Sequence, residues 1–282
     1  MDRIEAFNTI AAQAGRGELA FPASVDASIR LQQALVDPDC HVDTAARLIG
    51  ADPLLAARTV AIANSVAFNR SGTPISSVRA AVHRLGVRTL QSLVAALIVR
   101  QLGSAQPDAG LRAKADRLWA HTAHVAALAQ VIARRVTHVD PDTALFAGIV
   151  HEVGAFYLLS RAADFPGLVD GMVEEAPDDW IAHGETTIGR SVFGALMVPE
   201  HVVRAIEAMW TGMRALPPET LGDTLLLADD LAPAPSPMHA RPGATTPQAA
   251  RTIDFSVGDG TLQAILDESR VEVQSLHAVL ML

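Results

Sequence analysis

Apolar residues recur three and four positions apart through nearly every long segment of this chain of 282 residues. This spacing places side chains on one face of a helix. One segment shows the pattern clearly, with Leu118, His121, Val125, Leu128 and Ile132. No segment shows the sustained alternation of apolar and polar residues that is typical of a half-buried strand. The sequence therefore predicts an all-α fold.

The breaks between helical segments predict how the chain is divided. Half of the residues are hydrophobic, and the length suits one large module or two coupled modules with ample core. GSAQPDAG, residues 103–110, has the composition of a connection. We therefore expect an N-terminal helical bundle over residues 1–105, packed on a second helical bundle over residues 111–282. The second bundle should include a proline-rich irregular loop at 232–247 and a C-terminal helical extension.

Local signals predict where some helices begin and end. Asp52 and Pro53 supply an N-cap and a first-turn proline. Gly86 should separate one amphipathic helix from a longer and more apolar one. Asn64 and Ser65 end an apolar helix, where polar side chains can hydrogen-bond the last carbonyls or the following turn. We expect both residues to support structure.

The charge distribution argues against nucleic-acid binding. Residues 1–110 carry ten Arg and Lys against nine Asp and Glu, whereas residues 111–282 carry twelve against twenty-two, so the second half would repel a phosphate backbone. Residues 37–65 have a helix-turn-helix rhythm. However, the second helix of this motif is apolar around most of its circumference, with Arg58 and Asn64 as its main polar groups. We therefore expect no DNA partner.

Other features of the sequence predict a cytoplasmic protein without a membrane partner. Cys40 is the only cysteine, so no intramolecular disulfide is possible, and a reducing compartment fits. The N-terminus, MDRIEAFNTI, lacks a signal-peptide pattern. Strongly apolar runs such as LVAALIV at 93–99 are too short to cross a bilayer.

Asp140 and Pro141 should start one helix that runs through TALFAGIVHEVGAFYLLS, and because it is apolar on nearly all sides we expect it to be central. A histidine and a carboxylate stand side by side in this run, as His151 and Glu152. Burying both is costly unless each is paired or bound to something. Three interpretations are open at this point: a metal site, the remains of one, or two core residues with satisfied hydrogen bonds. The other histidines at 183, 201, 239 and 277 have no second ligand at helical spacing, and we expect them at the surface.

The residues resemble a known bacterial signalling module. The first half carries the DP helix start, the ANS triplet, the PISSV turn and the RLG turn, and in these features it resembles the N-terminal half of an HDOD domain. The stretch from LWAHTAH through GIVHEVG to the helix before Trp210 resembles the HD-like half of the same module. The resemblance covers roughly residues 20–215, and residues 216–282 are covered only weakly.

The resemblance implies an N-terminal helical bundle against a bundle related to the HD-superfamily metal phosphohydrolases. Active members of that superfamily hold a divalent metal with a histidine, an adjacent His-Asp pair and a distant aspartate. By resemblance His121 stands at the first histidine and His151 at the second. Glu152 stands where aspartate is usual, and Asp229 or Asp230 lies near the last ligand.

This sequence also departs from the superfamily pattern at the outer histidines of the phosphodiesterase branch. Glu185 stands in place of one of them, and Met209 and Trp210 stand in place of a pair. Glutamate at 152 is one methylene longer than aspartate, so its oxygens would be placed differently. We therefore expect no metal and no other cofactor. His121, His151, Glu152 and Asp229 would be vestigial or alternative ligands within a buried, hydrogen-bonded network.

Two functions of different classes follow from the resemblance. The leading one is a non-enzymatic adaptor that contacts other signalling proteins, in cyclic-dinucleotide, motility or stress signalling. The alternative is a metal-dependent phosphohydrolase that acts on a nucleotide or a cyclic dinucleotide. In that case a mononuclear site would be built from His121, His151, Glu152 and Asp229.

Overall fold

The structure is a computed structural model, and it confirms the all-α prediction. It describes residues 2–69, 71–104, 108–168, 180–212, 215–238, 241, 243–250 and 252–281. The protein is 71% helical. Within the described residues, the one sheet is a pair of antiparallel two-residue strands, β1 (Ser256–Val257) and β2 (Gly260–Thr261).

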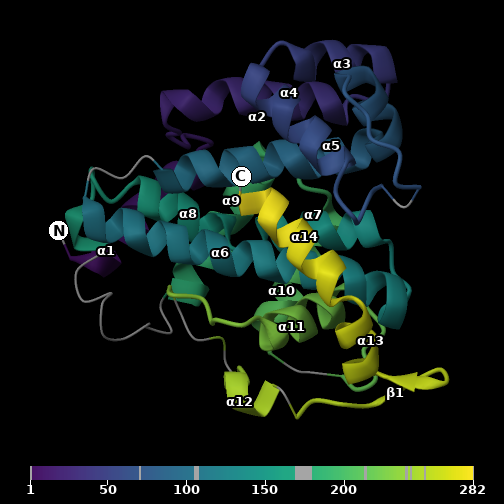
Figure 1. Cartoon of the computed structure of the whole chain (residues 1–282). Helices are drawn as coiled ribbons and strands as arrows, with labels where there is room; N and C mark the ends of the chain where they lie inside the picture. The colour runs from purple at the N-terminus through teal and green to yellow at the C-terminus, as the bar shows by residue number, and fades with distance from the viewer. Residues whose placement is uncertain are drawn as a thin grey trace.

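The first half of the chain is built around one long helix. Figure 1 shows α2, α3 and α4 grouped on one side of it, whereas α1 lies apart from them. The bounds of the five helices are α1 (Arg3–Gly15), α2 (Ala23–Val36), α3 (Val42–Gly50), α4 (Pro53–Ala63) and α5 (Val78–Ser104). Asp52 caps α4 through the backbone N–H groups of Leu54 and Leu55, as predicted. Gly86 interrupts α5 with a φ of 75°, a left-handed conformation that favours glycine. Gly86 therefore separates two helical segments, as predicted, and they meet at a kink within α5.

The second half contains the helices that surround the buried polar residues. Their bounds are α6 (Ala109–Ile132), η1 (Ala133–Thr137), α7 (Pro141–Val150), α8 (Val153–Ser160), η2 (Pro166–Leu168), η3 (Trp180–Gly189), α9 (Arg190–Ala195), α10 (Glu200–Trp210), α11 (Leu221–Leu231), α12 (Pro247–Ala250), α13 (Leu262–Glu268) and α14 (Arg270–Met281). The backbones of α6 and α7 approach closely at Gly148, where an added Cβ would lie 2.5 Å from the Cα of Ala126. Helix α7 is buried from Ala144 to Val150. It is central, as the sequence predicted.

The apolar run around His151 is not one continuous helix. Helix α7 ends at Val150 and α8 begins at Val153, so His151 and Glu152 lie in the bend between them. The expectation of a single helix through this run is therefore wrong. The bend is held locally, because Nδ1 of His151 bonds the carbonyl of Gly148 at 2.7 Å.

The N-terminal residues contact the second half of the chain. Helix α1 packs against η2, η3 and α9. The N–H of Ala20 donates to the hydroxyl of Tyr157 at 3.3 Å, and the rings of Phe21 and Tyr157 meet edge to face with centroids 5.5 Å apart. The two halves are thus tied together at the beginning of the chain as well as at the α5–α6 connection. The proposed division at residues 103–110 stays a prediction.

Two helical stretches are longer and more apolar than the sequence analysis allowed. Val78–Ser104 and Pro141–Ser160 have the length and hydropathy of candidate membrane spans. In the most apolar window of each stretch, 61% and 83% of the residues are buried within the protein. Packing in the core therefore accounts for their apolar character without a bilayer. The expectation that every apolar run is too short to cross a bilayer does not hold for these two stretches.

The C-terminal helix α14 docks on α6 through two histidines (Figure 1). The rings of His124 and His277 are stacked, with centroids 3.6 Å apart and planes 29° apart. An ion pair joins Arg134 to Glu272, and a second joins Arg135 to Glu268 at 2.7 Å. The expectation that His277 is an unengaged surface residue is wrong, because α14 turns it onto α6.

The His124–His277 stack predicts that acid weakens the docking of α14. Burial, followed by the neighbouring His124, lowers the pKa of His277 from 6.5 to about 4. Between these two values the unfolded chain binds more protons than the folded one, so stability falls as the pH is lowered through this interval. We expect the melting temperature to drop from pH 7 to pH 4.5, and to drop less in His277→Phe. Parallel pH profiles for the two proteins would contradict this prediction.

Asn64 holds the turn that follows α4, as the sequence predicted. Its side-chain amide donates to the carbonyl of Ile75 at 2.7 Å, and its side-chain oxygen accepts from the N–H of Ile75 at 2.8 Å. The neighbouring Ser65 is buried, and its hydroxyl has no hydrogen-bond partner among the described residues. The predicted supporting role is therefore confirmed for the side chain of Asn64 and not for that of Ser65.

Replacing Asn64 by leucine should lower the free energy of unfolding by about 2 kcal/mol, because two hydrogen bonds are lost and the backbone groups of Ile75 lose their partners. Urea denaturation measures this change. Asn69→Leu, in the same turn, is the control, since the side chain of Asn69 only accepts a 3.4 Å bond from Ser71. Equal losses in the two variants would contradict the assigned role.

Candidate functional site

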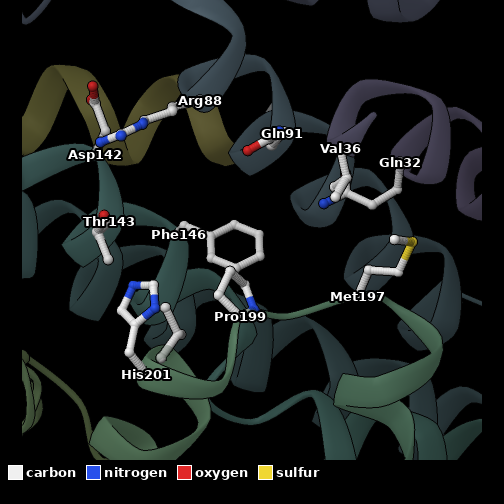
Figure 2. A pocket seen from close by; sticks show the side chains of 11 residues that line it. Gln32, Val36, Arg88, Gln91, Asp142, Thr143, Phe146, Met197, Pro199 and His201 are labelled. Carbon is white, nitrogen blue, oxygen red and sulfur yellow. The ribbon is translucent and has the colours of Figure 1, made fainter. Parts of the chain in front are cut away.

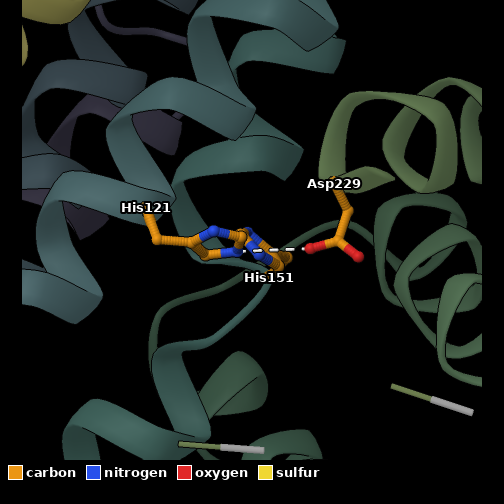
Figure 3. Close-up of side chains that lie close together, drawn as sticks. All are labelled: His121, His151 and Asp229. Carbon is orange, nitrogen blue, oxygen red and sulfur yellow. Dashed lines mark ion pairs between the residues drawn. The ribbon is translucent and has the colours of Figure 1, made fainter. Parts of the chain in front are cut away.

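Three of the four predicted ligand residues meet in the core of the second half. His121 comes from α6, His151 from the bend between α7 and α8, and Asp229 from α11. One ligand atom from each lies within 4.8 Å of the others. Figure 3 shows the two imidazole rings and the carboxylate converging from separate elements. The His121 and His151 side chains are 1% and 0% exposed, so bulk water does not solvate this cluster.

His121 is placed between two acceptors. Its Nδ1 lies 2.8 Å from the carbonyl oxygen of Ala234, and its Nε2 lies 3.2 Å from Oδ1 of Asp229. Burial lowers the pKa of His121. The bond to Asp229, the charges of Glu152 and Asp229, and the Ala234 carbonyl together outweigh burial and raise it to about 9. Both nitrogens of His121 therefore face oxygen acceptors of the chain, and this arrangement favours the charged imidazole.

His151 is the neutral histidine of the cluster. Its Nδ1 donates to the carbonyl of Gly148, and burial lowers its pKa. Its Nε2 is buried and has no hydrogen-bond partner within the part of the chain that is described. The ring lies 6.2 Å from that of Trp210 with planes 28° apart, and 5.8 Å from the ring of His121. Trp210 thus covers one face of the histidine, in a position where relatives of the superfamily would carry a metal-binding residue.

Glu152 lies beside the cluster and is not one of its three converging residues. One of its oxygens accepts from the hydroxyl of Thr122 at 3.5 Å and lies 4.0 Å from Nε2 of His151. The bend after His151 and the longer side chain account for this placement. The prediction that Glu152 belongs to a buried polar network fits these contacts better than its assignment as an alternative ligand.

Glu185 occupies the place expected for an outer histidine, and it is buried. Its Oε1 accepts from the N–H of Ala155 at 3.0 Å, which ties η3 to α8. Burial, and then the charge of Glu152, raise the pKa of Glu185 well above its ordinary value. Both effects favour the neutral form of the carboxyl group, which serves as a structural link between η3 and α8.

The sequence analysis missed Arg241, which supplies a buried cation. It lies in the proline-rich stretch at 232–247 that was expected to be only an irregular loop. Its side chain is 2% exposed, its Nε lies 3.0 Å from Oδ2 of Asp229, and its Nη2 lies 2.5 Å from Oδ1 of Asp230. The N–H of Thr245 also donates to Asp230 at 3.1 Å. The described residues of this stretch, here called the strap, therefore reach into the site through Ala234, Arg241 and Thr245.

One signal in the sequence could have pointed to this arrangement. Asp229 and Asp230 are adjacent on an otherwise apolar helix, and two buried carboxylates need compensating cations. The sequence does not show which cation compensates them, because Arg241 follows in a segment without periodicity.

The arrangement does not fit a divalent metal ion. Asp229 already lies between the imidazolium of His121 and the guanidinium of Arg241. Burial raises the pKa of Asp229, but these cations lower it well below its usual range, so the carboxylate is charged and balanced. A metal would need a free nitrogen on His121 and a fourth donor. As arranged, an ion would have to displace the proton between His121 and Asp229 and separate Asp229 from Arg241, and Glu152 stands to one side.

Other predicted surface histidines are only partly described. His201 is exposed in the first turn of α10, as expected. The side chain of His183 and the whole of His239 lie outside the described residues.

Comparisons with known proteins agree with the fold. Residues 21–210 match the HDOD domain family. A solved HDOD domain protein of unknown function from Geobacter sulfurreducens is 22% identical, with a TM-score of 0.62 and 98% of both chains covered. A protein from Shewanella amazonensis, described provisionally as a metal-dependent phosphohydrolase, is 18% identical with a TM-score of 0.62, covering 99% of this chain and 98% of that one.

A third structure differs in length. A protein from Marinobacter aquaeolei, described provisionally as a signal transduction protein, is 17% identical with a TM-score of 0.58, covering 100% of this chain and 67% of that one. At these identities the three structures show the shared fold alone. No curated protein matches the chain.

Arg241 should be needed for stability. In Arg241→Met the ion pairs to Asp229 and Asp230 are lost and both carboxylates stay buried. We expect the free energy of unfolding at pH 7, measured by urea denaturation, to fall by about 3–5 kcal/mol. Arg241→Lys keeps the charge but lacks the planar fork, and it should lose less. A methionine variant as stable as the unsubstituted protein would show that Arg241 does not carry this role.

Proposed function

The chain belongs to the HDOD family, and from this membership we propose that it is a non-enzymatic signalling protein that works through contacts with other proteins. The site it shares with the HD superfamily has then become a structural centre. The provisional description of the Marinobacter protein as a signal transduction protein is in keeping with this proposal. We propose the cytoplasm as its compartment and other signalling proteins as its partners.

The observation that carries the proposal is the position of Arg241. A phosphohydrolase of this superfamily uses a metal ion to activate water and to bind the phosphoryl oxygens. Here the carboxylate that would hold such an ion is paired with a guanidinium of the same chain, 3.0 Å away. Asp229 and Asp230 are thus paired with cations of the same chain, His121 and Arg241, and this pairing stabilises them without an ion.

The burial of the cluster supports the same conclusion. His151 is 0% exposed, Glu152 is 1% exposed, and Trp210 lies against the His151 ring. A phosphodiester must bring its phosphorus atom within about 3–3.5 Å of the attacking group. Among the described residues, Trp210 lies against the ring and the strap contacts His121 through Ala234, so a substrate of that size would have to displace one of them to reach the cluster.

One observation favours the alternative, a metal-dependent phosphohydrolase acting on a nucleotide or a cyclic dinucleotide. His121, His151 and Asp229 converge within 4.8 Å, and Nε2 of His151 has no hydrogen-bond partner in the described residues. Under this alternative, Arg241 would have to leave Asp229 before an ion could bind. The two functions therefore differ in what the purified protein contains and in what it hydrolyses.

Elemental analysis and a turnover assay test the proposal. Protein purified from cells supplied with manganese, iron and zinc should contain far less than one such ion per chain. It should not hydrolyse bis(p-nitrophenyl) phosphate or a cyclic dinucleotide above the rate of heat-denatured protein. About one ion per chain, with turnover lost in folded His121→Ala and Asp229→Ala variants, would establish the alternative instead.

A genetic test separates signalling from catalysis. In a strain from which the gene has been deleted, a folded His151→Gln variant should reverse the defect that the deletion causes as fully as the unsubstituted protein does. The proposed role needs the fold and not the histidine nitrogen. The hydrolase alternative predicts that this variant fails. Circular dichroism and abundance in the cell would show that the variant is folded and present.

A further inference from the structure

The C-terminal helix α14 lies across both halves of the chain. Figure 1 shows it running over α6 toward α5. Leu276 packs against Ala67 of the first half and against Ala127 of α6. One turn later, Leu280 lines a small cavity together with Ile62 of α4. The surface that α14 covers, here called the α14 groove, is formed by Leu55, Ile62, Ala67, Leu93, Trp119 and Ala127.

The α14 groove receives apolar side chains at helical spacing. Val273 packs with Leu276 against Ala67, and Leu280 follows four residues after Leu276. Leu276 and Leu280 are 3% and 9% exposed. Residues at positions i, i+3 and i+7 lie on one face of a helix, and an amphipathic helix binds a groove through this pattern. The occupant of the groove therefore needs three apolar residues at this spacing.

Two arginines beside the α14 groove favour an acidic helix. Arg134 pairs with Glu272, and Arg135 pairs with Glu268 at 2.7 Å. Both arginines belong to η1, which continues α6. Complementary charges of this kind fix the register of a docked helix and exclude wrong partners. The occupant therefore needs acidic residues near its N-terminal end.

Few side chains hold α14 in place. Two of its twelve residues are buried, whereas 15 of the 24 residues of α6 are buried. Arg135 and Glu268 are 41% and 66% exposed, and an ion pair so accessible to water contributes little stability. A helix with few buried residues opens locally at a lower free-energy cost than the core does. We therefore expect α14 to leave the groove while the core stays folded.

The groove and its occupant belong to different parts of the chain. Helices α4 and α6 lie within residues 21–210, which match the HDOD domain, whereas α14 follows that region. At the edge of the groove, the N–H of Val66 donates to Oγ of Ser275 at 3.3 Å, yet Val66 is 57% exposed. The domain thus provides an apolar surface that α14 covers incompletely.

We propose that the α14 groove binds an acidic amphipathic helix of a partner protein, and that α14 occupies the groove when this partner is absent. The proposal rests on the proposed signalling function, because it specifies the kind of partner. The partner helix presents apolar residues with the spacing of Val273, Leu276 and Leu280, and acidic residues before them. Because α14 must leave first, it raises the partner concentration that binding requires.

Displacing α14 would also loosen the junction between the two halves. A cavity of about 350 Å³ lies between α2 and α5 on one side and α7 and α10 on the other. Figure 2 shows side chains of both halves around this space, among them Gln91 and Phe146. Helix α14 bridges the same two halves through Ala67 and Ala127, so its release removes a contact across an incompletely packed junction. Partner binding would thereby favour a different arrangement of the halves.

A fluorescein-labelled peptide with the sequence of residues 268–282 tests the groove by fluorescence anisotropy. In full-length Leu276→Asp a carboxylate would lie against Ala67 and Ala127, so α14 should leave the groove. This variant should bind the peptide about tenfold or more tightly than the unsubstituted protein does. Val271→Asp is the matched control, because Val271 is on the same helix and is 61% exposed, and its affinity should be unchanged. A peptide with aspartate in place of both buried leucines should not bind.

Hydrogen exchange on the unsubstituted protein measures the release of α14 directly. Amides of residues 276–280 should exchange about tenfold or more faster than those of residues 125–131 in α6, because α14 opens without unfolding the core. Low concentrations of urea should accelerate exchange in α6 and leave exchange in α14 nearly unchanged, since local opening exposes little surface.

Four results would overturn the proposal. They are absence of saturable peptide binding to folded Leu276→Asp, equal affinity of the three proteins for the peptide, equal protection of α14 and α6, and loss of the near-ultraviolet circular dichroism in Leu276→Asp. The last would mean that α14 belongs to the core. A dimer that Leu276→Asp converts to a monomer in light scattering would assign the groove to a second copy and overturn the choice of partner.

These measurements are independent of metal content and turnover. A failed peptide experiment would remove the groove and leave the signalling proposal standing. Metal-dependent hydrolysis would remove the signalling proposal and leave the peptide affinities as they are. The two failures are therefore distinguishable.

Discussion

The charge balance around Asp229 determines how the second half of this protein is organised. One carboxylate accepts from an imidazolium on α6 and a guanidinium on the strap, while α11 carries the carboxylate itself. Helix α6 is thereby held to α11 and to the strap that follows α11 in the chain. Because charges of this kind are strongly unfavourable in the core when unpaired, each of the three residues requires the other two.

The same balance sets what an ion would have to displace at this cluster of donors. A carboxylate paired with arginine is a poorer ligand for a cation, and a histidine that bonds a carboxylate must give up that contact before it can bind a metal. Around this centre, Glu185 and Trp210 pack as core residues. The donors therefore lie together, while Asp229 is already paired within the chain.

Much of the fold could be predicted from the sequence, because periodicity and caps are local signals. The helices follow the apolar spacing, Asp52 caps α4, and Asn64 bonds the turn that follows it. The resemblance to a known family placed His121, His151 and Asp229 correctly as neighbours. The bend at residues 151–152 could not be predicted in this way, because apolar residues continue on both sides of it. Arg241 was missed because it lies in a stretch without periodicity, and His277 was missed because its partner, His124, lies in a distant segment.

The position of Arg241 in the chain also affects the order of synthesis and folding. His121 emerges from the ribosome well before Arg241, and Asp229 and Asp230 emerge shortly before it. Until the strap has been made, Asp229 and Asp230 lack the cation that allows their burial, so the second half cannot close as a finished core. An N-terminal fragment that stops before the strap would therefore expose these acidic groups to water, and proteases could distinguish it from the complete protein.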